Sequence, residues 1–172
     1  MSRRSYASIM SVLILFVFFG LVPSAFSQDK PGNPIRVDIP VKLEEAKVVF
    51  SMDHLAFSGD LPSGMKYMHL LAGRLKESGT RGHIVGVFYG DATYMVLNDK
   101  AYNAYRNVST GNPYKELLIT LNKEDVQIEV CAVAMKTHQW GNDDLLPDIK
   151  VNSGAIGRLI QLVQQGYVQL QP

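Results

Sequence analysis

The sequence predicts an α/β domain in which a mainly parallel sheet of about five strands is covered by helices on both faces. Apolar runs of strand length alternate along the chain with segments of helical periodicity, and this order is typical of parallel strands joined by helices. The run at 84–89 is apolar throughout, which indicates a strand buried on both faces.

The first half of the domain predicts two strands and one helix. Residues 47–50 form the first strand, and residues 84–89 form the second. Between them, Asp60 and Pro62 mark the start of the helix, because proline is tolerated in the first helical turn. Apolar residues at spacings of three and four give this helix one inward face: Leu61, Met65, Met68, Leu71 and Leu75.

The middle of the chain predicts two further helices. Residues 92–96 fit either a short strand or a helical turn, whereas residues 98–108 are predicted to be helical. Asn112 and Pro113 mark the start of the next helix. The inner face of that helix consists of three leucines: Leu117, Leu118 and Leu121.

The last part of the domain predicts three strands and two helices. The strand at 126–130 alternates apolar and polar residues, so we expect it nearer a sheet edge than the strand before it. A helix at 132–138 and a strand at 149–151 follow. Ser153 is expected to cap the last helix, which leads into a final strand at 167–170. The predicted inner stripe of the last helix is Ile156, Leu159, Ile160 and Val163.

Residues 1–27 have the pattern of a secretory signal peptide. Two arginines supply the charged start, residues 9–22 form the apolar core, and Ala25 and Ser27 are the small residues that a signal peptidase reads. An uncleaved membrane anchor is the alternative, but the apolar stretch is shorter than the roughly 20 residues that a spanning helix needs. We therefore predict cleavage after Ser27 and a periplasmic or secreted protein that is not held in the membrane.

The mature chain is expected to begin with an extended arm at residues 28–44 and to continue as one domain at residues 45–172. Three prolines among polar residues favour an extended arm over a packed element. About 145 residues remain after cleavage, a typical length for one domain with its own core. Removal of two arginines from 17 basic residues leaves 15 against 16 acidic ones, a formal charge of −1. A near-neutral chain without basic runs is not expected to bind nucleic acid.

Cys131 is the only cysteine in the chain and directly follows the predicted strand at 126–130. The carboxyl ends of parallel strands are where α/β proteins gather their ligands. A helix is predicted to begin beside the thiol, and the partial positive charge of a helix N-terminus favours a thiolate. One cysteine in an oxidising compartment cannot form an internal disulfide. Cys131 is therefore a buried small hydrophobe, an intermolecular partner or a reactive group, and these alternatives stay open.

Polar and aromatic residues in nearby loops are candidates to assist the thiol. His54 follows the first strand and is expected on the same sheet edge as Cys131, where it could handle protons with Asp53 beside it, although a loop histidine is more often simply solvated. His138, seven residues after Cys131, is a second candidate for proton handling. The residues predicted to line a pocket are Asp53, Gly90, Asp91 and Trp140.

Several classes of site have no support in the sequence. Neither a P-loop nor a dinucleotide fingerprint occurs, and there is no Gly-x-Ser-x-Gly motif of a serine hydrolase. The four histidines do not pair at the spacing of a zinc site, and one cysteine cannot form a structural zinc cluster. We therefore predict neither a cofactor nor a metal.

The run at 126–131, the segment at 142–147 and the tail at 158–167 resemble the DsrE/DsrF-like sulfur-relay family, and the resemblance extends over residues 45–171. It implies a three-layer α/β/α sandwich, related to the flavodoxin architecture, that assembles into homotrimers or homohexamers. It also implies that Cys131 carries sulfur as a persulfide. The partners would be a sulfane-sulfur donor and a protein with an acceptor thiol. The well-studied relay proteins work in the cytoplasm, whereas this chain is predicted to be exported, so their partners are not carried over to it.

Two functional hypotheses follow. In the first, the chain is a sulfurtransferase-like sulfur carrier in which Cys131 accepts and releases sulfane sulfur. In the second, it is a non-catalytic binding or assembly module in which Cys131 is a buried structural residue. Accessibility of the thiol to alkylation discriminates between them.

Overall fold

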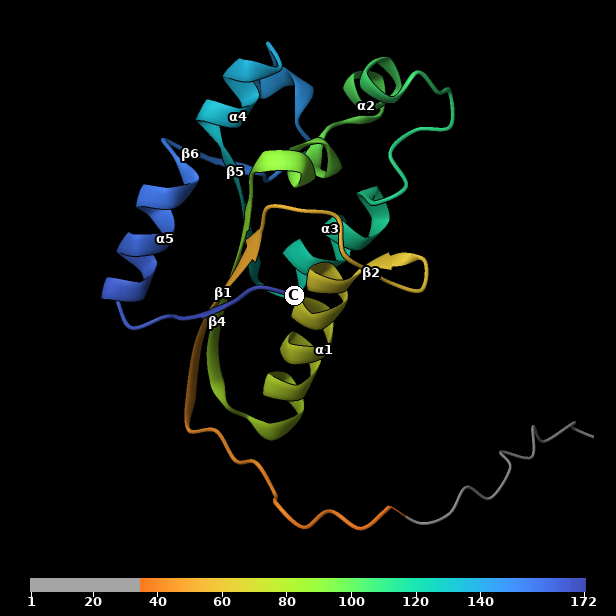
Figure 1. The fold of residues 1–172 in the computed structure, drawn as a ribbon. Coiled ribbons are helices and arrows are strands. Elements are labelled where there is room, and N and C mark those ends of the chain that lie inside the picture. Colours follow the sequence, from red (N-terminus) through yellow and green to blue (C-terminus); the bar gives the residue numbers. More distant parts are fainter. Residues whose placement is uncertain (1–34) are drawn as a thin grey trace, which may run out of the picture. The chain divides into compact units, whose positions relative to one another are not determined.

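A computed structural model describes residues 35–172 (Figure 1). The predicted signal peptide, its cleavage site and the start of the arm lie outside these residues. The chain divides into two units, Met1–Pro40 and Val41–Pro172. In the described part of the first unit, residues 35–40 form no helix or strand, and Arg36 pairs with Asp38 at 2.7 Å.

The second unit contains every helix and strand of the described residues. In chain order they are β1 (Glu45–Met52), β2 (Phe57–Ser58), β3 (Leu61–Pro62), α1 (Ser63–Ser78), β4 (Arg81–Phe88), the 3₁₀ helix η1 (Gly90–Val96), α2 (Asp99–Arg106), α3 (Lys115–Lys123), β5 (Val126–Cys131), α4 (Ala132–Thr137), the 3₁₀ turn η2 (Asn142–Asp144), β6 (Lys150–Asn152), α5 (Ala155–Gln164) and β7 (Val168–Leu170). None of the helices within residues 35–172 is long and apolar enough to span a bilayer.

A five-stranded sheet with the order β6-β5-β4-β1-β7 forms the middle layer, and every pair of neighbours in it is parallel. The central position of β4 explains why its second half is apolar at every residue, since both faces of that strand are covered. β5 lies one place from the sheet edge, as its alternating sequence predicts. The mainly parallel sheet of five strands is thus confirmed. The short strands β2 and β3 form a separate antiparallel hairpin.

Helices cover both faces of this sheet, which makes three layers (Figure 1). α1 and α3 pack on one face, where Phe50 and Ile128 join the larger apolar core. α5 packs on the other face, over a smaller core that contains Val49 and Val85. Successive residues of a strand point to opposite faces, so Val49 and Phe50 fall in different cores. Cys131 belongs to the α5 side.

The first helix begins later than Asp60 and Pro62 predict. Pro62 is extended, with φ −58° and ψ 125°, and pairs in the β2–β3 hairpin, so α1 begins at Ser63. The backbone N–H of Ser63 donates to the carbonyl of Ala56 at 2.8 Å, which closes this hairpin. Leu61 is therefore exposed, whereas the methionines predicted on the inward face are fully buried.

The helix predicted to start at Asn112 also begins later, because Asn112 has a different role. Its side-chain amide is buried and donates to the carbonyls of Met95 and Leu97 at 2.8 and 2.5 Å. That contact ties the loop to η1, the 3₁₀ helix formed by the ambiguous segment at 92–96, and leaves α3 to start at Lys115.

The last helix presents a different face to the sheet from the one predicted. Its buried residues are Ala155, Leu159 and Leu162, and Ser153 does not cap it, because Gly154 occupies that position without a side-chain hydrogen bond. Three of the four residues in the predicted stripe are exposed: Ile156 by 63%, Ile160 by 54% and Val163 by 47%. The small side chain of Ala155 faces inward beside Cys131. The larger side chains of the predicted stripe therefore lie on the outer side of the helix.

Candidate functional site

Cys131 is the last residue of β5 and the residue from which α4 departs. Its side chain is 6% exposed and lies between the sheet and α5. The backbone N–H of Ala155, in the first turn of α5, donates to the Cys131 Sγ at 3.3 Å. A helix N-terminus presents such unpaired N–H groups, and they favour a negative charge on the atom that accepts them.

A hollow of about 350 Å³ lies beside the thiol. It contains no charged side chain. Its lining consists of Tyr89, Gly90, Cys131, Val133, Ala134, Gly154, Ala155, Ile156 and Gly157. The volume is room for several heavy atoms, since a water molecule occupies about 30 Å³. This apolar surrounding favours a neutral, polarisable ligand over a strongly solvated ion, because an ion would lose its hydration there without a charged partner.

Gly90 forms part of this wall for a steric reason. Its φ of 54° lies in the left-handed region, and a Cβ atom there would stand 2.8 Å from the carbonyl oxygen of Asp53. Only glycine meets both conditions without strain. The turn at Gly90 starts η1 and brings the chain past the end of β4, so it shapes the hollow from that side.

Glu129, two residues before Cys131 on the same face of β5, is a buried acid held by three neighbouring side chains. It is 3% exposed, and Arg158 of α5 donates to both carboxylate oxygens, at 2.9 Å and 2.7 Å for the shortest contacts. Gln127 and Asn152 donate at 2.6 and 3.2 Å. Burial acts to raise the pKa of Glu129, but the hydrogen bonds from these three residues outweigh it and hold the pKa below its ordinary value. The ion pair between Glu129 and Arg158 joins α5 to β5 two residues before Cys131 along the strand.

The structure places Asp53 and His54 at the carboxyl end of β1, and β4 lies between that strand and β5. His54 Nδ1 and Asp53 Oδ1 are 2.5 Å apart, and Gln171 also donates to the Asp53 carboxylate at 3.1 Å. The hydrogen bond to His54 lowers the pKa of Asp53, although burial opposes it. No hydrogen bond among the described residues joins either side chain to Cys131, and neither lines the hollow.

Asp91 is exposed at the start of η1, where its backbone N–H donates to the carbonyl of Asp53 at 2.9 Å. It fixes the loop but does not line the hollow beside Cys131.

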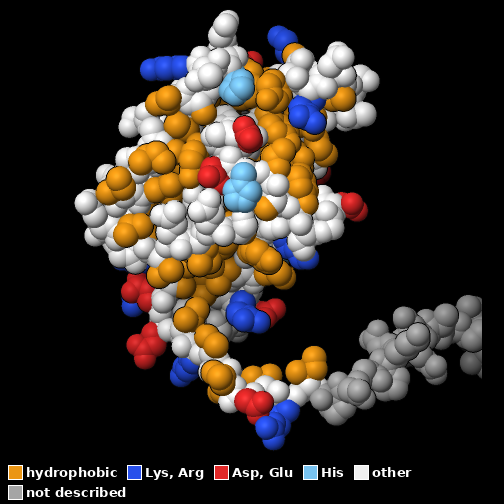
Figure 2. All heavy atoms as spheres, in the orientation of Figure 1, with side chains coloured by type: hydrophobic (Ala, Val, Ile, Leu, Met, Phe, Trp, Pro, Cys, Tyr) orange, Lys and Arg blue, Asp and Glu red, His pale blue; other side chains and the backbone are white. Residues whose placement is uncertain are grey.

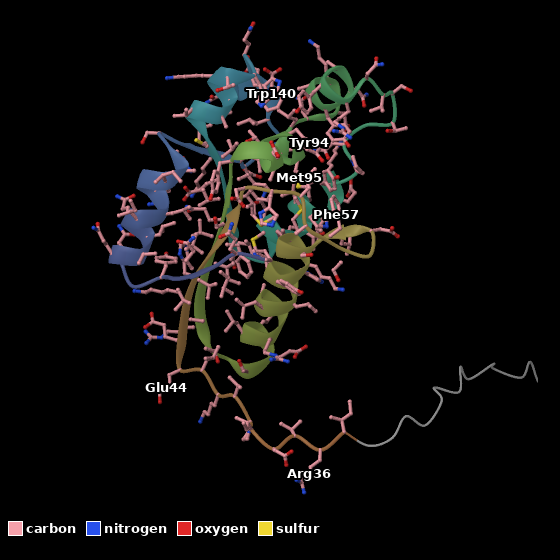
Figure 3. All side chains as sticks on the ribbon, viewed as in Figure 1. Arg36, Glu44, Phe57, Tyr94, Met95 and Trp140 are labelled. Carbon is pink, nitrogen blue, oxygen red and sulfur yellow. The ribbon has the colours of Figure 1, made fainter. Side chains whose placement is uncertain are left out.

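His138 caps the end of α4 that is farther from Cys131, and Trp140 follows it. Figure 3 labels Trp140. Their rings stack with centroids 4.4 Å apart, and Tyr105 packs edge-on against both. A six-residue helix is about 9 Å long, so this aromatic cluster stands apart from the thiol and lines another part of the surface.

Sequence reasoning missed Tyr89, directly after β4, and the residues of α5 that complete the hollow. Tyr89 follows the central strand, where its position at the carboxyl edge was a usable signal; its hydroxyl shares a hydrogen bond with Ser51 Oγ at 2.9 Å. Ile156 was expected in the core, so the sequence offered no signal for its place in the wall.

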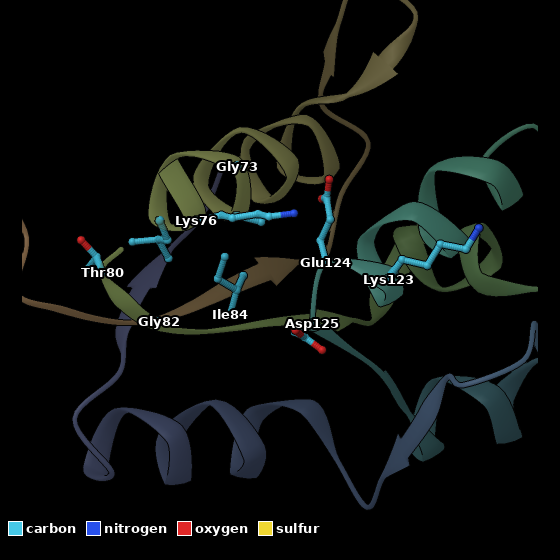
Figure 4. A pocket seen from close by; sticks show the side chains of 10 residues that line it. Gly73, Lys76, Thr80, Gly82, Ile84, Lys123, Glu124 and Asp125 are labelled. Atoms are coloured by element: carbon cyan, nitrogen blue, oxygen red, sulfur yellow. The ribbon is translucent and has the colours of Figure 1, made fainter. Parts of the chain in front are cut away.

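A second hollow, of about 390 Å³, opens between α1 and α3 at the end of the sheet where the strands begin (Figure 4). Lys76, Thr80 and Lys123 lie in its lining together with Glu124 and Asp125. It adjoins the starts of β4 and β5, whereas ligands of parallel sheets gather at the strand ends. Within residues 35–172, no group of three or more His, Cys, Asp or Glu residues is placed to hold a metal.

Comparison with known proteins identifies the fold. A model of the DsrE/DsrF-like family matches residues 44–172. The solved structure of MTH1491 from Methanobacterium thermoautotrophicum, described as a protein of unknown function, is similar with a TM-score of 0.57 at 17% identity, over 74% of this chain and 99% of that one. The crystal structure of the YchN protein from E. coli is similar with a TM-score of 0.52 at 15% identity, over the same shares. No curated protein matches.

Proposed function

The chain belongs to the DsrE/DsrF-like family over residues 44–172, and from that premise we propose that it binds or relays sulfane sulfur as a persulfide on Cys131. Membership of the family accounts for a sulfur-relay type of fold. The observation that carries the finer proposal is the position of the thiol: Cys131 Sγ accepts a backbone N–H from α5 and faces an uncharged hollow of about 350 Å³.

The proposed step is a sulfur transfer between thiols. The Cys131 thiolate attacks the outer sulfur of a donor persulfide, R–S–SH, the S–S bond of the donor breaks, and the donor leaves as the thiolate R–S⁻. Cys131 then holds the outer sulfur as Cys–S–SH, and the thiolate of an acceptor protein removes it by the same reaction in reverse. The N–H of Ala155 stabilises the anionic sulfur in both directions. Proton handling by His54 or His138 is not part of the step, because neither side chain borders the hollow.

The partners of this reaction are a sulfane-sulfur donor and an acceptor thiol outside the cytoplasm. That location rests on the signal pattern of residues 1–27.

Replacement of the thiol tests the proposal. Cys131→Ser is nearly isosteric, so we expect it to fold and to cost at most about 2 kcal/mol of stability. A serine hydroxyl cannot replace the thiolate as a nucleophile near neutral pH. Mass spectrometry of protein purified without oxygen and incubated with a polysulfide should show added sulfur, in steps of 32 Da, on the parent and none on the variant.

A non-catalytic binding module is the second candidate, favoured by the burial of Cys131 to 6% exposure among apolar neighbours. Labelling of the native protein with iodoacetamide separates the two. Alkylation of Cys131 in the folded state, at a rate well above that of global unfolding, is required for a carrier. Labelling only after denaturation, together with no sulfur loading, would establish the structural role instead.

A further inference from the structure

Residues 35–43 of the predicted arm have a regular alternating pattern. Every second residue is apolar, and the residues between are charged or proline, which is the pattern of an extended strand with one apolar face. Those apolar side chains are exposed: Ile35 by 92%, Val37 by 71%, Ile39 by 82%, Val41 by 77% and Leu43 by 42%. Isolated exposed apolar residues are ordinary, but five on one face of a nine-residue segment indicate a surface that is covered by something.

A groove along α5 is the matching surface. A hollow of about 410 Å³ between α5 and the sheet shares Tyr89 and Ile156 with the hollow beside Cys131, so the two form one groove. The outer row of α5 along it is Ile156, Ile160 and Val163, all about half exposed or more. No charged side chain lines either part. In Figure 2, the side of the molecule along which α5 runs shows apolar side chains interspersed with uncharged polar ones.

The spacings of the two surfaces agree. Neighbours three or four apart in a helix stand about 5–6 Å from each other, and alternate residues of a strand stand about 6.7 Å apart. Three successive apolar side chains of the arm can therefore each lie against one of the three residues in the outer row of α5. The sheet residues under α5, such as Val49, Val85 and Val87, are already buried, so the exposed apolar surface of this region belongs to the outer row of α5.

Leu43, where the chain enters the domain, is held beside the turn that follows α1. Thr80 Oγ1, in the turn between α1 and β4, donates to the carbonyl of Leu43 at 3.1 Å. This contact holds the end of the arm at the α1 side, and α5 covers the opposite face. Nine extended residues span about 30 Å, which is enough to reach a neighbouring molecule.

We propose that the arm of one copy lies in the α5 groove of a second copy. Reciprocal exchange covers both apolar surfaces in each molecule, and the two arms and two grooves together contribute toward the roughly 800 Å² per partner that a stable interface buries. Residues 35–43 precede the segment at 44–172 that matches the family, so this contact belongs to the particular chain and not to the family fold. The contact can be tested without any reaction at Cys131.

Light scattering of the purified full-length gene product, processed as the cell processes it, tests the exchange. The parent should form a dimer or larger assembly at micromolar concentration. The double variant Ile35→Asp/Ile39→Asp and the groove variant Ile160→Asp should each raise the dissociation constant at least 100-fold. The matched controls Arg36→Ser and Gln165→Asp alter the polar face of the arm and the exposed residue that follows α5, so they should leave assembly unchanged. A monomeric parent, or an assembly that survives both apolar changes, would overturn the proposal.

Disulfide trapping distinguishes exchange between copies from folding back within one chain. In a Cys131→Ser background, one protein carries Val37→Cys and another carries Ile160→Cys. The mixture of the two should form a disulfide-linked pair of twice the chain mass, whereas Arg36→Cys in place of Val37→Cys should trap far less. A protein with both Val37→Cys and Ile160→Cys that closes its disulfide only within a single chain would contradict exchange. Circular dichroism of each variant confirms that the fold is intact.

Discussion

At the scale of single residues, β5 carries two inward side chains with different physical roles. Glu129 is fully paired: Arg158, Gln127 and Asn152 all donate to its carboxylate. Cys131, one pleat further on, receives a single N–H and faces an open hollow. The acid therefore anchors α5 to the sheet, whereas the thiol borders the hollow. The alternating pattern of β5 was visible in the sequence, but the partner of Glu129 was not, because Arg158 is 29 residues away.

Glu129→Gln should destabilise the fold by about 3 kcal/mol, because it removes one partner of a largely buried ion pair and leaves the Arg158 guanidinium without its counter-charge. Glu116→Gln, on the exposed surface of α3, is the control and should change the free energy of unfolding by less than about 0.5 kcal/mol. Chemical denaturation at pH 7 measures both. Equal effects of the two substitutions would show that the pair adds nothing to stability.

The same pair predicts a dependence on pH. The pKa of Glu129 is lower in the folded chain than its ordinary value of 4.5, so the folded state holds the carboxylate in its charged form. Its contribution to stability is complete above pH 4.5 and is lost as the pH falls through the lower pKa of the folded state. Unfolding curves between pH 7 and pH 3 should therefore show a steeper loss of stability for the parent than for Glu129→Gln. Parallel curves would contradict the assignment.

At the scale of elements, local pattern predicted which segments are strands more reliably than where helices begin or which face they bury. The central strand and the cysteine strand follow directly from apolar composition and alternation. Two helices begin later than predicted, because the residue expected at the helix start makes another contact. Pro62 pairs in a hairpin, and Asn112 donates to the carbonyls of Met95 and Leu97. The face of α5 was predicted wrongly because Ala155 and Leu162 turn inward, and amphipathic spacing alone does not distinguish two adjacent stripes of a largely apolar helix.

Two glycines should respond to alanine in opposite directions. Gly90→Ala should destabilise by about 2 kcal/mol or more, because it places a Cβ at positive φ and 2.8 Å from a backbone oxygen. Gly73→Ala, inside α1 with no atom within 4 Å of the new Cβ, should stabilise by about 0.5–1 kcal/mol through the unfolded state. Urea denaturation of both variants checks the pair. A neutral Gly90→Ala would mean that the turn before η1 can relax.

At the scale of the whole molecule, the order of strands decides which predicted residues meet. The sequence placed Cys131 and His54 at the same edge of the sheet, which is correct for parallel strands. It could not show that β4 separates their strands, because that order arises from the crossover connections. For the same reason the hollow is built from the ends of β4 and β5 and the starts of α4 and α5, segments up to 68 residues apart in the chain, from Tyr89 to Gly157.

The last prediction concerns the chain as the cell makes it. Two arginines, the apolar core at 9–22 and the small residues Ala25 and Ser27 predict that the exported product begins at Gln28. Expressed in a bacterium with a periplasm, the full chain should yield a periplasmic protein whose intact mass lacks residues 1–27. Ala25→Arg should block processing and leave the precursor at the membrane, because the peptidase requires a small residue there. An untouched N-terminus on protein recovered from the cytoplasm would refute export, and with it the choice of extracytoplasmic sulfur donors.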